Sequence, residues 1–72
     1  MKSLSKRQQE VYDFVVQYRN ENEISPSIAD IADGLGLANT TIATYIDALK
    51  RKGRVSSIPG VPRSFKILPA IA

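Results

Sequence analysis

The sequence predicts a mainly α-helical domain of three helices followed by a small antiparallel β-hairpin. Two observations support this fold class. Apolar residues recur at steps of three and four along three stretches of residues 1–52. After Gly53 the pattern changes to two short β-like runs around a turn rich in proline and glycine. We expect one domain over residues 1–68 and a tail at 69–72. Its core must be thin, because a chain of this size buries roughly 60% of its unfolded surface.

The first helix is predicted from a capping box and an apolar stripe. Ser5 and Gln8 have the spacing at which a serine hydroxyl accepts from a backbone amide and a glutamine reaches back. The helix should then run to about Asn22. Its buried stripe consists of apolar side chains at helical spacing, namely Val11, Phe14, Val15 and Tyr18. In the linker that follows, Ile24 is expected to fill the core.

The second helix is short. Ser27 and Asp30 form another capping box in front of an apolar pattern, which predicts a helix over Ile28–Leu35. Either Gly34 or Gly36 can supply the left-handed residue that ends it.

The third helix follows at once. Asn39 is expected to cap it, and it should run to Lys52 and stop at Gly53. Two helices joined by a glycine-marked turn in a small basic domain are typical of a helix-turn-helix.

The remaining chain predicts the hairpin. Residues 54–58 and 64–68 have the composition of two short strands. Pro59-Gly60 should begin the turn and Pro62-Arg63 should close it. Phe65 and Ile67 alternate onto one face and should cover the helices, since an isolated hairpin is only marginally stable. Three helices and such a hairpin make a winged helix-turn-helix.

The charge is distributed unevenly. The net charge is +3, but residues 1–36 carry four basic and six acidic side chains, whereas residues 37–72 carry six basic side chains and one acidic. This asymmetry indicates a polyanionic partner. A solvated basic rim without a partner is the alternative interpretation.

The third helix has the features of a recognition helix. With Ile42, Ile46 and Leu49 facing inward, the helical repeat turns Thr40, Thr44, Asp47 and Arg51 outward, with Thr41 and Ala43 on the flanks. Small polar side chains allow a helix to approach base edges in the major groove, and threonine can contact several bases. The alternative is an ordinary solvent-facing surface, for which threonine is an unusual choice because it is a mediocre helix former.

Contacts to phosphate are expected around this helix. The amides at the start of the second helix, together with Ser27, could hold an anion. Lys50, Lys52 and Arg54 should cluster where the third helix ends, and Arg63 at the hairpin tip could reach the backbone or the minor groove.

Several segments also resemble a known family. They are MKSLSKRQQEVYDFV, SPSIADIADGLGL, IDALKRKGRV and the hairpin end RSFKIL. Together they are similar to the amino-terminal DNA-binding domain of the LexA repressors of the bacterial SOS response, from residue 1 to about residue 68. The resemblance implies a repressor of DNA-damage genes that binds palindromic double-stranded operators as a homodimer on DNA, with weak or no dimerisation of this chain alone.

The resemblance also implies residue roles. The positions that match base contacts are Asn39, Thr40, Thr41, Ala43 and Thr44, and those that match backbone contacts are Arg7, Ser27 and Lys52, with the wing at residues 60–63. The turn before the third helix is about one residue shorter than in the best-known LexA proteins, and threonines stand where acidic side chains are common.

Other function classes have little support. The sequence contains no histidine and no cysteine, which removes the commonest general base and the thiolate metal ligands. The Ser–Lys self-cleaving peptidase of full-length LexA proteins is absent, so we expect no enzyme activity and no cofactor. No apolar run approaches a membrane span and no signal peptide is evident, so a cytoplasmic location at the bacterial nucleoid is expected. A winged-helix module that binds a repressor protein without contacting DNA is the alternative function.

Overall fold

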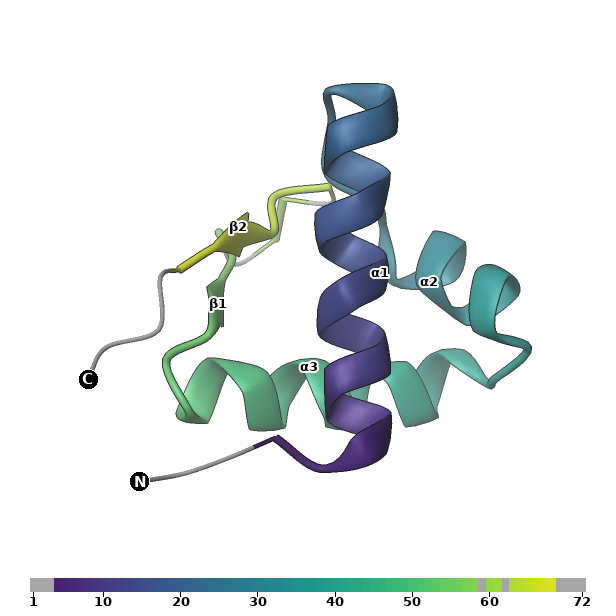
Figure 1. The fold of residues 1–72 in the computed structure, drawn as a ribbon, viewed down its shortest axis with the longest axis vertical. Coiled ribbons are helices and arrows are strands. Elements are labelled where there is room, and N and C mark those ends of the chain that lie inside the picture. The colour runs from purple at the N-terminus through teal and green to yellow at the C-terminus, as the bar shows by residue number, and fades with distance from the viewer. Residues whose placement is uncertain (1–3, 59, 62, 69–72) are drawn as a thin grey trace.

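The protein folds as three helices and a two-stranded hairpin, as a computed structural model of the chain shows (Figure 1). The structure describes residues 4–58, 60, 61 and 63–68. The helices are α1 (Lys6–Asn22), α2 (Ile28–Leu35) and α3 (Asn39–Arg51), and the strands are β1 (Val55–Ser56) and β2 (Lys66–Ile67). The winged helix-turn-helix prediction is confirmed. The expected tail at 69–72 and the turn residues Pro59 and Pro62 lie outside the described residues.

Both predicted capping boxes are present. The Ser5 hydroxyl accepts from the Gln8 amide, and the Ser27 hydroxyl accepts from the Asp30 amide, each with the reciprocal bond. Helix α2 ends at Gly36, whose φ of 69° is the left-handed conformation that glycine adopts without strain. Gly34 has another role, because a side chain at this position would collide with the ring of Phe14. It therefore allows α1 and α2 to approach closely.

The core lies where the three helices meet, with α3 running across the amino-terminal half of α1 (Figure 1). Val11 and Val15 of α1 are fully buried there, while Phe14 and Tyr18 flank them, half-buried, with their rings stacked 6.1 Å apart. The rest of the core consists of Ile31, Ala32, Ile42, Ile46, Leu49, Val55 and Phe65.

The hairpin is shorter than expected, with Val55 opposite Ile67 and Ser56 opposite Lys66 in an antiparallel pair. Phe65 is buried and Ile67 packs against the core, so the prediction that both cover the helices is confirmed.

The prediction for Ile24 is wrong, since 52% of this residue is exposed. Glu23 takes a left-handed conformation at the end of α1, and the chain then turns Ser25 and Pro26 inward instead. Ser25 is a buried polar residue, and its hydroxyl accepts from the Phe65 amide at 3.0 Å. The linker therefore holds the segment between the two strands against the helices. This segment, described at residues 57, 58, 60, 61 and 63–65, is called the wing below and is longer than the 60–63 of the sequence prediction.

Candidate nucleic-acid interface

Helix α3 presents one face to solvent. Ile42, Ile46 and Leu49 are buried in the core, which confirms the predicted phase of the helix. The exposed side chains on the other side are those of Thr40, Ala43, Thr44, Asp47 and Arg51, with Thr41 half-buried on the flank. An outward surface of small side chains at the start of a helix matches the shape needed in a major groove.

The start of α3 differs from the sequence prediction. Ala38, not Asn39, is the N-cap, and it makes no side-chain capping bond. The first bond of the helix runs from the Ile42 amide to the Ala38 carbonyl, so the helix begins one residue earlier than expected. Asn39 is consequently the first helical residue, and its exposed amide group is not used as a cap.

Two contacts shape the outward face. The Thr44 hydroxyl donates to the Thr40 carbonyl at 3.1 Å, one turn back along the helix. Asp47 pairs with Arg51 at 3.4 Å, also one turn apart. Both members of this ion pair are well exposed, so it adds little stability but offsets the charge that Arg51 would otherwise present.

A groove of about 500 Å³ separates α3 from the wing, and the start of α2 closes one side of it. Three of the expected phosphate ligands line this groove, namely Ser27, Lys50 and Arg63, and the acidic Asp47 lines it with them. Apolar side chains line it as well, and two of them, Ile58 and Val61, are largely exposed on the wing. The structure therefore combines a hydroxyl, two cations and one carboxylate along a surface that continues from the recognition helix.

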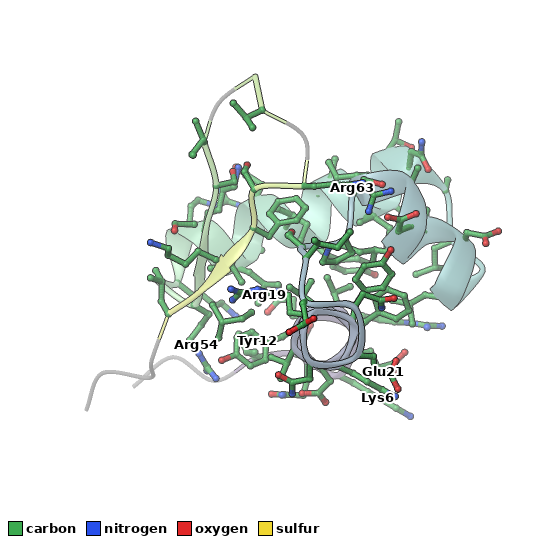
Figure 2. The ribbon with its side chains drawn as sticks, turned by 90° about the horizontal axis from the view of Figure 1, so that it is seen from above. Lys6, Tyr12, Arg19, Glu21, Arg54 and Arg63 are labelled. Atoms are coloured by element: carbon green, nitrogen blue, oxygen red, sulfur yellow. The ribbon has the colours of Figure 1, made fainter. Side chains whose placement is uncertain are left out.

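Arg63 does not project from the wing as expected. Its backbone is left-handed, with φ of 57°, and its side chain folds back towards α2 (Figure 2). The Nη1 atom lies 2.6 Å from Asp30 Oδ2 and also donates to the Tyr18 hydroxyl and the Ser25 carbonyl. The bond to Tyr18 and the attraction of Asp30 raise the pKa of Arg63. The side chain thus links the wing to α1, to α2 and to the linker between them.

The start of α2 is not an empty anion site. Asp30 Oδ2 accepts from the Ser27 amide, and the Ser27 hydroxyl accepts from the Asp30 amide, both at 3.1 Å. The Ser27 amide, the Ser27 hydroxyl and the Arg63 guanidinium together hold the pKa of the Asp30 carboxyl below its usual value. Two of the amides expected to bind phosphate are therefore used within the helix cap.

The three cations near the end of α3 have different contacts. Lys50 lines the groove, whereas Lys52 Nζ donates to Gln8 Oε1 of α1 at 2.7 Å. The Arg54 guanidinium lies over the Tyr12 ring, 4.7 Å from its centre (Figure 2). Arg7, at the start of α1, pairs with Glu10 at 3.1 Å. The sequence prediction placed Lys50, Lys52 and Arg54 together; in the structure Lys50 lines the groove, whereas Lys52 and Arg54 contact α1 at Gln8 and Tyr12.

Comparison with known proteins identifies the family. Residues 1–64 match the family described as the LexA DNA binding domain. The chain belongs to this family. A LexA repressor of Exiguobacterium sibiricum is 35% identical over 94% of this chain and 34% of its own length. LexA repressors of Herpetosiphon aurantiacus and Staphylococcus aureus are each 32% identical, over 97% and 94% of this chain and 33% of their own lengths.

The LexA resemblance inferred from the sequence is thus confirmed, and with it DNA binding as the function of the domain. The alternative of a module that only binds a repressor protein is not favoured. The family that matches is a DNA-binding domain. The chain spans about a third of the length of the curated relatives it matches. In the described part of the chain, no helix is long and apolar enough to cross a bilayer.

Proposed function

We propose that this chain binds palindromic operator DNA as the DNA-binding module of a LexA-type repressor, with α3 in the major groove and the wing beside the DNA backbone. The observation that supports this most directly is the outward face of α3. Its exposed residues are small at the amino-terminal end, and the groove that continues from it contains Ser27 and Lys50. This arrangement allows bases and phosphates to be contacted from one surface.

Base contacts come from the start of α3. Asn39, Thr40, Ala43 and Thr44 are exposed within the first two turns, and Thr41 lies half-buried beside them. A helix inserted by its amino-terminal end brings these positions to the base edges.

Phosphate contacts come from two kinds of residue. Ser27 and Lys50 line the groove. The Ser27 hydroxyl accepts from the Asp30 amide and stabilises the Asp30 carboxylate, so its hydrogen must turn from that carboxylate to a phosphate on binding. Three further cations already contact side chains of α1, namely Arg7, Lys52 and Arg54. On binding DNA, each of them must share its partner with a phosphate or exchange the partner for it. Arg63 carries five N–H donors, so it can contact phosphate while Nη1 keeps its present partners.

Two copies are proposed to occupy one operator. A single module of this size buries only roughly 600–1,000 Å², so one copy binds weakly. Dimerisation on DNA would place two α3 helices in successive major grooves, about 34–36 Å apart. The relatives are three times as long as this chain, and we propose that the dimer of a full-length repressor supplies the remaining affinity, at the nucleoid in the cytoplasm.

A salt titration tests the proposal. The chain is titrated with a random-sequence duplex between low and physiological salt, and the logarithm of the binding constant is plotted against the logarithm of salt concentration. We expect a linear fall with a slope of roughly −0.9 per phosphate contacted, which a flat response or a lack of binding at low salt would contradict.

A further inference from the structure

The first two turns of α3 present hydrocarbon rather than charge. Between Asn39 and Ile46 the sequence contains no arginine, lysine, glutamine or glutamate. Between Asn39 and Ile46 the exposed side chains are those of Thr40, Ala43 and Thr44, and each of them carries a methyl group. Lys50 and Arg51, the first cations on the helix, lie in its last turn.

This composition discriminates between base pairs. In the major groove, guanine is bound by the paired donors of arginine or lysine, which are lacking here. Adenine is bound by the side-chain amide of asparagine, and thymine offers its 5-methyl group to apolar contact with alanine or the threonine methyl. Asn39 matches adenine in this scheme, and the methyl groups of the other three exposed residues match thymine, although a threonine hydroxyl can bond to several bases.

Thr44 is further restricted by its own hydrogen bond. Because the hydroxyl hydrogen is donated to the Thr40 carbonyl, the side chain has no donor left for a base. The bond also fixes the rotamer, since threonine is branched at Cβ and its hydroxyl position determines the position of its methyl group. Thr44 therefore offers a fixed methyl group and an acceptor oxygen, and it cannot donate to the oxygen or nitrogen acceptors of guanine.

We propose that the first two turns of α3 select A·T pairs, and that Thr40, Ala43 and Thr44 recognise the 5-methyl groups of thymines in the major groove. The proposal rests on the proposed function, because it specifies the bases that the same helix contacts. The expected ligand is a double-stranded half-site. Its thymines face Thr40, Ala43 and Thr44 in the major groove, and an adenine faces Asn39.

The test removes the methyl group from the DNA. A duplex enriched from a random pool by the 72-residue chain is prepared with deoxyuridine in place of thymine, one position at a time, and each affinity is measured. Deoxyuridine keeps the base pair and every hydrogen-bonding group. At each contacted thymine we expect affinity to fall about fourfold, the factor that corresponds to ~0.8 kcal/mol for one buried methyl group. Thymines outside the half-sites serve as controls and should be unaffected.

Two variants assign the contact to a residue. Thr44→Ser removes the methyl group and keeps the hydroxyl, so one thymine position should lose its sensitivity to deoxyuridine. Thr44→Val keeps a methyl group at the same place and removes the hydroxyl, so the sensitivity should remain. Thr44 is exposed, so neither change disturbs the core, and circular dichroism verifies folding.

The outcomes separate the two proposals. The methyl readout would be overturned if the enriched half-sites had G·C pairs facing the first two turns of α3. Equal affinities for thymine and deoxyuridine at every position would also overturn it. DNA binding would stand in both cases. If the folded chain binds no duplex even at low salt, the proposed function fails and the readout with it.

Discussion

Arg63 Nη1 lies 2.6 Å from Asp30 Oδ2, and this ion pair joins the wing to the first turn of α2. Asp30 also accepts from the Ser27 amide, so one carboxylate completes the cap of α2 and anchors the wing. The two side chains are partly exposed, which limits the contribution of the pair to stability. Its main consequence is geometric, because the wing and the start of α2 both line the groove beside α3.

The Asp30 contacts predict a stability change in acid. A carboxyl group whose pKa is lowered by folding stabilises the folded state above its unfolded pKa, roughly pH 4, and loses this effect as pH falls through the lowered value. Asp30→Asn should therefore lower the free energy of unfolding at pH 7, and its difference from the parent should shrink below about pH 4. Urea unfolding across this range measures it. Asp33→Asn, an exposed change on the same helix, is the control. A difference that does not vary with pH would exclude the Asp30 carboxylate as its origin.

The buried hydrogen bond from the Phe65 amide to the Ser25 hydroxyl can be tested by mutation. Ser25→Ala leaves the buried Phe65 amide without its acceptor, which should cost ~1–3 kcal/mol of unfolding free energy. Chemical denaturation measures this cost. Asn20→Ala, on the exposed side of α1, should change stability by less than about 0.5 kcal/mol. Equal effects of the two changes would mean that the Ser25 hydroxyl does not hold the wing.

The phase of α3 can be tested with two isoleucines. Ile46 is only 2% exposed, and Ile46→Ala should cost ~2–5 kcal/mol, enough to unfold much of so small a domain. Ile58 is 60% exposed on the wing, and Ile58→Ala should have little effect on thermal unfolding. If the two variants melted at the same temperature, the outward face of α3 would have to be assigned again.

Lys50 tests the path of the DNA backbone. Lys50→Ala should weaken binding to all duplexes about equally and reduce the salt slope by ~1, because one phosphate contact is lost. Lys6→Ala removes the same charge on the side of α1 opposite Arg63 (Figure 2). Its salt slope should match that of the parent. If Lys50→Ala also had the salt slope of the parent, Lys50 would not be a phosphate contact.

Local sequence patterns predicted the helices well. Each capping box joins residues three apart, and the inward face of α3 follows from the helical repeat, so both can be inferred without the tertiary structure. The family resemblance rests on strings of neighbouring residues and was inferred for the same reason.

Long-range contacts determine what the sequence pattern did not predict. Gln8 and Lys52 are 44 positions apart, and Ser25 and Phe65 are 40 apart, so no local pattern indicates either contact. The fold-back of Arg63 depends in the same way on Asp30 and Tyr18, which belong to other elements. The start of α3 at Asn39, one residue earlier than the capping preference of asparagine predicts, was also missed.

Selection from random double-stranded DNA with the 72-residue chain tests the central claim most directly, that the first two turns of α3 contact bases. We predict an enriched palindrome whose half-sites are rich in A·T pairs and lie about one helical turn apart. Thr44→Ser should alter the preference at one or two positions of each half-site. Enrichment of no sequence by the folded chain, or a preference that is the same for parent and variant, would contradict the account.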